Sequence, residues 1–298
     1  MTIMTIPKVL DGLSLKSKIL TELTVRIARL EEKFNSKPGL AVILVGNNPA
    51  SKAYVGMKKK ACVQIGIKSF EYKLDVDVSE AELLALINKL NQDKTIHGIL
   101  LQLPLPDHID SDKMLHAIAP EKDVDGFHPV NVGKLLLGLP TFKSCTPYGV
   151  CELMKFYNID PTGKHVVILG RSNIVGKPLA AMLMQKQVPG NATVTVCHSR
   201  SKNLHDITRS ADILIAAIGK AYFVTADMLK PDAIVIDVGI NRVDDTSSER
   251  GYKLVGDVNY DDVYDKASAI TPVPGGVGPL TIAMLMTNTV ESFEFFQK

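Results

Sequence analysis

The chain has 298 residues, which at roughly 150 residues per domain predicts two domains. It is 46% hydrophobic and 22% charged, the composition of a globular protein that buries a large core. Its 34 basic and 32 acidic residues leave a formal net charge of +2, which argues against a protein that mainly binds nucleic acid or an anionic membrane. No apolar run approaches the ~20 residues of a membrane span, and Met1 to Gly12 lack the pattern of a secretion signal.

The cysteines indicate the redox environment. Cys62, Cys145, Cys151 and Cys197 form no Cys-x-x-Cys pair and have no histidine at zinc-finger spacing. We therefore expect neither a disulfide framework nor a metal site. Thiols without a secretion signal are typical of a reducing compartment, so the sequence predicts a cytoplasmic protein.

Short apolar runs alternate with helical patterns in the first half of the chain. The pattern predicts strands over residues 40–46, 68–75 and 97–103 and helices over residues 54–67 and 79–93. Ser79 and Glu82 have the spacing of a capping box at the start of the second helix. This β-α-β-α-β order predicts a parallel sheet covered by helices.

The second half repeats the alternation after a break. Residues 119–145 contain several prolines and glycines and are predicted to be irregular, and Thr146 and Pro147 are the expected N-cap and first residue of a helix to about residue 158. The following pattern predicts strands over residues 165–169, 192–197, 212–217, 233–238 and 269–271, helices over residues 178–187 and 280–296, and a surface loop over residues 244–251.

A strand, a glycine turn and a helix follow one another in residues 165–178. Gly170 ends the strand and Gly176 opens the helix, whose free amides and positive dipole end suit a pyrophosphate. The usual Gly-x-Gly-x-x-Gly is absent, because Ser172 stands at the middle position. The glycines alone fit an ordinary strand-to-helix turn equally well, and the surrounding βαβ order favours a dinucleotide site.

The end of the next strand favours NADP over NAD. NAD sites usually carry an acidic residue there for the ribose 2′-hydroxyl, whereas this strand ends Cys197-His-Ser-Arg200. Ser199, Arg200 and Arg171 instead supply donors and positive charge for a 2′-phosphate. The alternative for Arg200 is an ordinary solvated surface charge.

A helix with a tyrosine and three lysines follows the first predicted strand. Ser51 is the expected N-cap, and Tyr54 and Lys58 share one helix face at i, i+4. A phenol beside an amine suits acid–base chemistry. The alternative is a solvated run of lysines, from which Lys58 differs because only it is in line with Tyr54.

Three further segments carry polar or glycine-rich features. Gln102 ends an apolar strand, so once buried its amide needs partners, either backbone groups or a ligand. Asp123 and Asp125 flank a valine before a glycine and are compatible with a simple turn. Residues 271–279 hold three glycines and three prolines, which suit either close approach to a ligand or a shaped loop.

Together these segments resemble the bacterial bifunctional methylenetetrahydrofolate dehydrogenase/methenyltetrahydrofolate cyclohydrolase family. Five motifs occur in family order over nearly the whole chain: Tyr54-Val-x-x-Lys58, Leu-Gln102-Leu-Pro-Leu-Pro, Lys122-Asp-Val-Asp-Gly126, Gly170-Arg-Ser-x-Ile-Val-Gly-x-Pro178 and Pro274-Gly-Gly-Val-Gly-Pro279. One departure is Ser201, where the family often has threonine. The resemblance implies NADP-dependent oxidation of 5,10-methylenetetrahydrofolate to 5,10-methenyltetrahydrofolate, followed by hydrolysis to 10-formyltetrahydrofolate.

The resemblance also implies the site residues. Lys58 is the expected main catalytic residue, with Tyr54, Gln102 and Asp125 completing the catalytic set. The expected folate-binding residues are Tyr54, Lys58, Leu101, Gln102, Leu103, Asp125, Pro274, Gly275, Gly276, Gly278, Pro279 and Thr281. The expected NADP-binding residues are Gly170, Arg171, Ser172, Ile174, Val175, Gly176, Ser199, Arg200, Gly219, Gly239 and Ile240.

The implied fold is α/β with two domains. An N-terminal α/β folate-binding and catalytic domain is expected from residues 1–145 and 275–298, with the last helix returning to it. A Rossmann-type NADP-binding domain is expected from residues 146–274, and the family resemblance implies a homodimer formed through these domains.

The sequence alone leaves two other hypotheses about the function open. Another two-domain NADP dehydrogenase, such as a shikimate-type enzyme, is not expected to combine the Tyr54–Lys58 helix with the Pro274–Pro279 segment. A folate- or dinucleotide-binding protein without turnover would not need Lys58. An assay of methylenetetrahydrofolate with NADP⁺ separates these readings.

Overall fold

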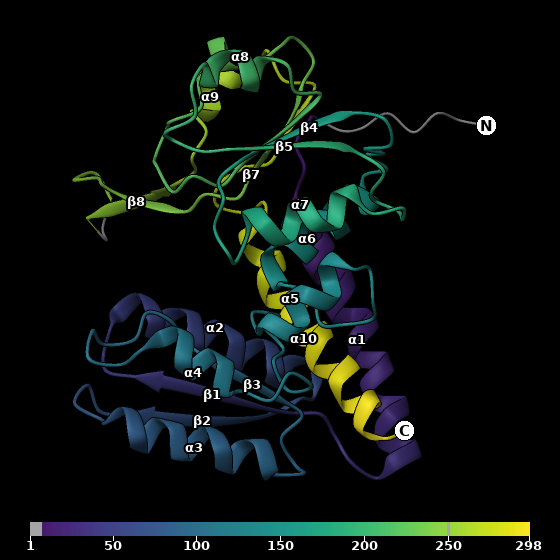
Figure 1. Ribbon diagram of the computed structural model, residues 1–298, viewed down its shortest axis with the longest axis vertical. Coiled ribbons are helices and arrows are strands. Elements are labelled where there is room, and N and C mark those ends of the chain that lie inside the picture. Colours follow the sequence, from purple (N-terminus) through teal and green to yellow (C-terminus); the bar gives the residue numbers. More distant parts are fainter. Residues whose placement is uncertain (1–7, 249–250) are drawn as a thin grey trace. The chain divides into compact units, whose positions relative to one another are not determined.

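The computed structural model describes residues 8–248 and 251–298 (Figure 1). Within these, the chain divides into two compact units. We call residues 17–145 with 282–298 the three-strand unit, and residues 8–16 with 146–281 the five-strand unit, after their parallel sheets. Among the described residues, no helix is both long and apolar enough to cross a membrane.

The three-strand unit has a parallel sheet of order β2-β1-β3. Its elements are β1 (Gly39–Val45), α2 (Pro49–Ile65), β2 (Lys68–Leu74), α3 (Glu80–Gln92), β3 (Gly98–Leu101), α4 (Ser111–Ala117) and α5 (Pro129–Leu136). Every residue of β1 is buried, as expected for the central strand of a covered sheet. The chain passes from β1 to β2 on one side and then to β3 on the other, which makes a topological switch point between β1 and β3.

The carboxyl ends of β1 and β3 lie at the same edge of this sheet. Leu40 pairs with Gly98 and Ile43 with Leu101. A single parallel bridge between Ile99 and Asp123 adds a fourth segment beside β3. Residues that follow these three segments are therefore brought to one edge of the sheet.

The five-strand unit has a parallel sheet of order β10-β7-β6-β4-β5. Its strands are β4 (His165–Leu169), β5 (Thr193–Cys197), β6 (Ile213–Ala216), β7 (Ile234–Asp237) and β10 (Ala269–Ile270). Its helices include α7 (Gly176–Met184), α8 (Leu204–Arg209), the 3-10 helix η1 (Ala226–Met228) and α9 (Tyr260–Val263), and β8 (Asn241–Asp244) and β9 (Tyr252–Val255) form an antiparallel pair. The switch point lies at β4, which has β5 on one side and β6 on the other.

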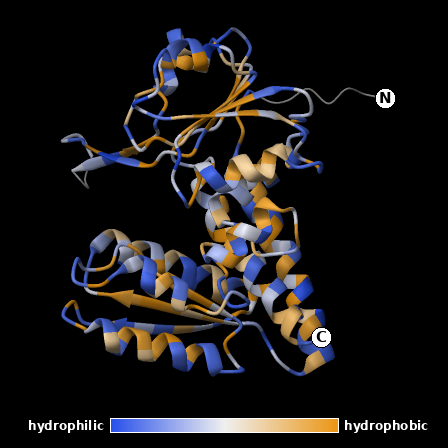
Figure 2. Ribbon diagram, viewed as in Figure 1, coloured by the Kyte–Doolittle hydropathy of each residue, from blue (hydrophilic) through white to orange (hydrophobic). Residues whose placement is uncertain are grey.

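The hydropathy of each strand follows its position in the sheet. The core strands β4, β6 and β7 are buried and apolar, which Figure 2 shows in orange, whereas the edge strand β5 is partly exposed. This is the pattern of a parallel sheet covered by helices, and it confirms the predicted α/β class.

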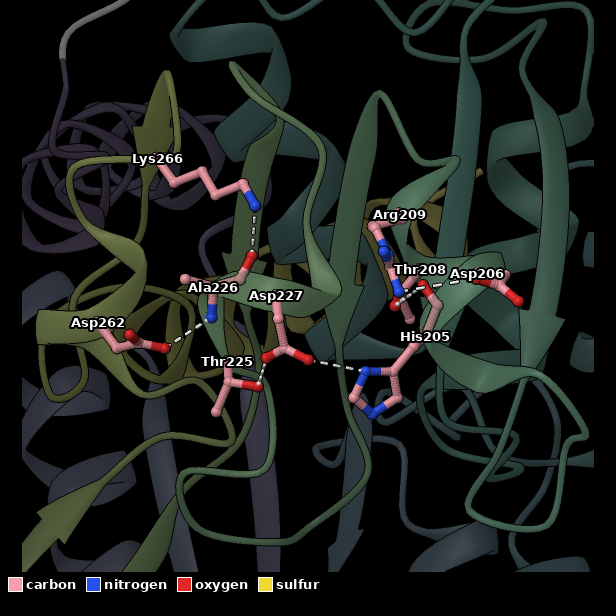
Figure 3. A network of polar contacts seen from close by, with 9 residues as sticks. All are labelled: His205, Asp206, Thr208, Arg209, Thr225, Ala226, Asp227, Asp262 and Lys266. Atoms are coloured by element: carbon pink, nitrogen blue, oxygen red, sulfur yellow. Dashed lines mark hydrogen bonds and ion pairs between the residues drawn. The ribbon is translucent and has the colours of Figure 1, made fainter.

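Polar side chains fasten the short helix η1 within the five-strand unit (Figure 3). The Nδ1 atom of His205 on α8 lies 2.9 Å from Oδ2 of Asp227. The Ala226 N–H donates to Asp262 Oδ2 at 2.6 Å, and Lys266 Nζ donates to the Ala226 carbonyl at 2.8 Å. A helix this short makes few bonds of its own, so these contacts hold it in place.

Three helices have residues on both sides of the division of the chain: α1 (Gly12–Phe34), α6 (Cys145–Phe156) and α10 (Gly278–Phe296). Residues 282–296 of α10 belong to the three-strand unit, where Arg26 and Glu294 form an ion pair and the rings of Phe34 and Phe293 meet edge to face. The last helix therefore returns to the unit formed by the first half of the chain.

The observed division differs from the predicted one at its ends. Residues 8–16 pack with the five-strand unit, because the Leu10 N–H donates to the Ile270 carbonyl and the Gly12 N–H to the Gly275 carbonyl, both at 2.9 Å. Residues 275–281 belong to the same unit rather than to residues 17–145. These contacts join residues 10–12 to residues 270–275, and no local sequence pattern predicts a contact between such distant segments.

Two predicted helix starts were wrong. The N-cap of α2 is Asn48, whose side chain accepts from the N–H groups of Ala50 and Ser51, with Pro49 in the first turn. The helix α6 already begins at Cys145, so Thr146 lies inside it. The segment predicted to be irregular also contains α5, and α1 and the strand pair β8–β9 were not predicted.

Candidate active site

Lys58 points into the three-strand unit, unlike the next lysine. It lies on α2, is only 9% exposed, and its Nζ donates to Gln102 Oε1 at 3.0 Å. Lys59 is exposed and pairs with Glu71 at 3.2 Å. The expected difference in direction between the two lysines is present, so Lys58 is not part of a solvated charge run.

Gln102 is held by the backbone at the end of β3. Its N–H donates to the Ile43 carbonyl at 2.9 Å, and its side-chain Nε2 donates to the Leu103 carbonyl at 2.7 Å. This fixes the amide so that Oε1 faces Lys58. Of its predicted neighbours in the site, Leu101 is buried at the strand end and Leu103 is partly exposed.

Asp125 lies in the loop after the bridge to β3. The Ile99 N–H donates to the Lys122 carbonyl at 2.8 Å, which aligns this loop with the sheet. Gly126 has φ +74°, and a Cβ there would lie 2.6 Å from the Ser144 nitrogen. Only glycine fits this position, so the turn after Asp125 is tight and closely packed.

The two carboxylates of this loop have different surroundings. Asp123 is 2% exposed and accepts hydrogen bonds from the His128 N–H at 2.8 Å and from Asn131 Nδ2 at 2.9 Å. Asp125 is partly exposed, and its surroundings penalise charge. Asp123 therefore stabilises the loop, whereas Asp125 is presented by it.

Desolvation raises the pKa of Asp125 to about 6. The positive charge of Lys58 opposes this shift, the negative charge of Asp123 adds to it, and a hydrogen bond with Cys145 opposes it. Burial also raises the pKa of the Cys145 thiol, so this cysteine is not a nucleophile.

The structure brings the four predicted catalytic residues to one edge of one sheet. Lys58 follows β1, Gln102 follows β3 and Asp125 follows the bridged segment. Tyr54 lies one turn before Lys58 on α2, is 36% exposed, and desolvation raises the pKa of its phenol. An amine, an amide oxygen and a carboxylate at a switch point can bind a polar substrate and move a proton.

The predicted glycine-rich folate segment belongs to the five-strand unit. Gly275 has φ +114°, Gly276 N–H donates to the Pro272 carbonyl at 2.8 Å, and Thr281 Oγ1 lies 2.9 Å from Thr146 Oγ1. Pro274 and Gly278 are exposed and Pro279 is partly exposed. Contact of this segment with a substrate stays a prediction.

A pocket of about 420 Å³ opens at the carboxyl ends of β4, β5 and β6. Its lining residues are Gly170, Arg171, Ser172, His198, Ser199, Arg200, Ala217 and Ile218. Five of them were predicted to bind NADP, whereas His198, Ala217 and Ile218 were not. They follow β5 and β6 directly, so the sheet order was the signal that could have found them.

The glycines of this pocket are required by close packing. Gly170 has φ +144°, and a Cβ there would lie 2.1 Å from the Ala217 carbonyl oxygen. A Cβ on Gly176 would lie 2.1 Å from the Gly170 carbonyl oxygen. The turn between β4 and α7 is therefore tight, which leaves room for a phosphate near the N-terminal amides of α7.

The charges of the pocket suit a phosphorylated ligand. Arg171, Ser199 and Arg200 are exposed, and no residue lining the pocket is acidic. Two arginines can pair with a phosphate, so these residues fit a dinucleotide with a 2′-phosphate.

The remaining predicted NADP-binding residues lie near the same edge of the sheet. Ile174 and Val175 precede α7, Gly219 follows β6, and Gly239 and Ile240 follow β7. Ile174 and Ile240 are exposed apolar side chains.

Family models match both halves of the chain. The catalytic domain of tetrahydrofolate dehydrogenase/cyclohydrolase matches residues 10–125, and the NAD(P)-binding domain of the same family matches residues 144–297.

Relatives of known name match the chain over nearly their whole length. The bifunctional protein FolD of Chlorobium phaeobacteroides is 55% identical over 287 residues, and that of Acetivibrio thermocellus is 56% identical over 285 residues, with 96% of each chain covered in both cases. The crystal structure of the bifunctional FolD enzyme of Campylobacter jejuni is 53% identical, covers 96% of this chain and 98% of its own, and has a TM-score of 0.91. The Trypanosoma brucei FolD, solved with NADP and an inhibitor, is 40% identical, covers 96% and 97%, and also has a TM-score of 0.91. The chain therefore belongs to the tetrahydrofolate dehydrogenase/cyclohydrolase family.

Proposed function

We propose that this chain oxidises 5,10-methylenetetrahydrofolate with NADP⁺ to 5,10-methenyltetrahydrofolate and hydrolyses that product to 10-formyltetrahydrofolate. Family membership supports both activities. The observation that carries the proposal is the bond from the buried Lys58 amine to Gln102, beside Asp125. A protein that only binds folate has no need of an amine in that place.

The five-strand unit supplies the dinucleotide site of the proposal. Bound NADP⁺ accepts the hydride in the dehydrogenase reaction. The amides after Gly170 and at the start of α7 hold the pyrophosphate, and Ser199, Arg200 and Arg171 hold the 2′-phosphate. No acidic side chain lines the pocket to repel that phosphate.

Asp125 holds the pterin in this proposal. A carboxylate accepts hydrogen bonds from the pterin's amino and ring N–H groups, and Asp123 is unsuited because it is 2% exposed and its Oδ2 already accepts from His128 and Asn131. Tyr54 stacks against the folate and hydrogen-bonds to it. Leu101 and Leu103 flank Gln102 in this site.

Lys58 handles protons in the cyclohydrolase reaction. Water adds to the methenyl carbon and gives up one proton. The ring nitrogen takes a proton as its bond to that carbon breaks, and the new hydroxyl loses its proton to become the formyl carbonyl, so one proton is released overall. Gln102 Oε1 holds the Lys58 side chain in the direction that serves both transfers. Hydride transfer needs the two reactants to be held in position and needs no proton abstraction at that carbon.

We also propose that the chain forms a homodimer through its nucleotide-binding domain and acts in the cytoplasm. The family resemblance supports the dimer. The four cysteines are buried and none is in a disulfide, and burial raises the pKa of Cys62 to about 12, so these thiols suit a reducing compartment. Light scattering of the purified protein tests the dimer.

One assay tests the proposed function. The protein is mixed with methylenetetrahydrofolate and NADP⁺, and the absorbances of NADPH and of the methenyl product are followed. Methenyltetrahydrofolate is then supplied alone, and its loss is followed. Turnover in both reactions is expected. Binding of both ligands without turnover would identify a binding protein, and NADPH formation without loss of methenyltetrahydrofolate would remove the second activity.

A further inference from the structure

A buried carboxylate outside the predicted site holds two loops of the five-strand unit. Asp257 is 0% exposed. Its Oδ2 accepts from the N–H groups of Ile218 at 2.7 Å and Gly219 at 2.9 Å, and its Oδ1 accepts from the Lys220 N–H at 3.0 Å and from Asn241 Nδ2 at 2.8 Å. One side chain therefore joins the loop after β6 to the segment after β7.

These two loops lie at the edge of the nucleotide pocket. Ile218 lines the pocket. A Cβ on Gly239 would lie 2.3 Å from Asp257 Oδ1, so the carboxylate packs directly against the loop that carries Ile240. Only glycine at position 239 admits Asp257 in this place.

A second buried carboxylate fixes Asp257 itself. Asp237, at the end of β7, accepts from the N–H of Asp257 at 3.1 Å, of Val258 at 2.9 Å and of Gly239 at 2.8 Å. The backbone of Asp257 is thereby tied to the sheet. The position of Asp257 therefore depends on β7, and the conformation of the two loops depends on the position of Asp257.

The chemistry of Asp257 is hard to replace. A carboxylate offers four acceptor sites, and here it receives four hydrogen bonds. An asparagine of the same shape would turn an N–H₂ group toward N–H donors. Charge-assisted bonds of this kind are the strong ones, so the loops gain a fixed conformation.

The sheet order indicates which part of the cofactor these loops meet. The residues proposed for the phosphates, Ser199 to Arg200 and Gly170 to Ser172, follow β5 and β4. The strands β6 and β7 lie on the other side of the switch point at β4. A dinucleotide bound across the carboxyl ends of such a sheet places its second half over β6 and β7.

We propose that Asp257 is a positioning residue of the dehydrogenase, which holds residues 218–220 and 239–241 in the conformation that receives the nicotinamide half of NADP. This rests on the proposed NADP site. Asp257 acts through the loops and does not itself touch the cofactor. Adenosine 2′,5′-bisphosphate lacks the nicotinamide half and meets mainly the residues after β4 and β5, so its binding depends on Asp257 much less than the binding of NADPH does.

The test compares Asp257→Asn with the unchanged full-length protein. Dissociation constants are measured for NADPH and for adenosine 2′,5′-bisphosphate, together with both enzymatic rates. NADPH is expected to bind at least about tenfold more weakly, since several charge-assisted hydrogen bonds are disturbed. The affinity for the bisphosphate and the rate of methenyltetrahydrofolate hydrolysis are expected to stay within about twofold.

Two further variants separate positioning from stability. Asp212→Asn is the matched control, because its carboxylate accepts from the His165 N–H at 2.7 Å and pairs with Lys230 at the amino-terminal edge of the same sheet. It is expected to lower stability without changing NADPH affinity. Asn241→Ala removes one hydrogen bond to Asp257 and leaves the carboxylate in place. If Asp257→Asn does not fold, this variant tests the role of Asp257 in NADPH binding instead. Its NADPH affinity is expected to fall by a smaller factor.

The outcomes are distinct. Equal losses for NADPH and the bisphosphate, or no loss for NADPH in either Asp257→Asn or Asn241→Ala, would overturn the role of Asp257. If the unchanged protein binds neither ligand, the proposed NADP site fails first, and the inference fails with it.

Discussion

Asp125→Asn is predicted to make the protein more stable while lowering both activities. The substitution keeps the shape of the side chain and removes its charge. The pKa of Asp125 is raised to about 6 in the folded chain by desolvation, against 3.8 for an ordinary aspartate. The folded state therefore holds this proton more tightly than the unfolded chain, and folding is penalised where the unfolded group is already ionised.

The size of the effect follows from that difference in pKa. The difference between a pKa of about 6 in the folded chain and 3.8 in the unfolded chain corresponds to about 3 kcal/mol at neutral pH. Because stability is lost as the pH rises from about 4 to about 6, most of the penalty is present at about pH 7.5, and it falls to about 1 kcal/mol at about pH 4.5. The attraction between Asp125 and Lys58 is already contained in this pKa, and burying the polar amide of asparagine offsets part of the gain, so we expect about 1–3 kcal/mol at neutral pH.

Urea unfolding of the full chain at the two pH values measures this gain. Asp123→Asn is the control. The carboxylate of Asp123 accepts hydrogen bonds from His128 and Asn131, so this substitution should destabilise the protein. The folate KM is expected to rise for Asp125→Asn, since an amide N–H₂ then faces pterin donors.

Two results would refute the reasoning on Asp125. If Asp125→Asn is no more stable than the unchanged protein at neutral pH, or if the difference does not shrink toward acid pH, its carboxylate is not penalised by burial. If Asp123→Asn impairs folate turnover while Asp125→Asn leaves it intact, the wrong aspartate has been assigned to the pterin.

Three further outcomes are expected. Lys58→Met should lower the cyclohydrolase rate by about 10²–10⁴-fold, with some dehydrogenase activity left and methenyltetrahydrofolate accumulating. Lys59→Met should change either rate little. Comparable cyclohydrolase rates in the two variants would exclude Lys58 from the mechanism. NADP⁺ should be preferred to NAD⁺ by about tenfold or more in kcat/KM, and Arg200→Ala should narrow that ratio; equal values for the unchanged protein would contradict the 2′-phosphate site. Gly12→Ala should lower the free energy of unfolding by about 1–3 kcal/mol, because its Cβ would lie 1.8 Å from the Gly276 carbonyl oxygen. Gly133→Ala should not lower it, because there is open space around Gly133. A urea midpoint unchanged by Gly12→Ala would contradict this packing.

The strands and their order along the chain could be predicted from local pattern. The apolar runs marked β4 at its observed bounds and β1 and β2 within one residue at each end. The turn between β4 and α7 could also be predicted from its glycines, because few residue types other than glycine fit a turn this tight. The strands and the approach of Gly176 to Gly170 depend on neighbours a few residues away, so the sequence alone determines them. The contact of Gly170 with Ala217 comes from the sheet.

Competition between nearby groups was harder to predict. Asn48 and Ser51 are both good N-caps, and the pair Asn48-Pro49 prevails, since proline suits the first turn and Asn48 accepts from two N–H groups. Asp123 and Asp125 look alike in sequence. Their roles separate only when His128 and Asn131 fold back onto Asp123.

Only the tertiary structure decided which polar groups meet. Lys58 finds Gln102 across 44 positions, and Asp257 reaches Ile218 across 39. No local pattern records such pairs, because burial and hydrogen-bond partners come from the packing of distant segments. The sequence determined which residues could do chemistry, and the sheet topology determined which of them lie together, because parallel strands bring their carboxyl ends to one edge.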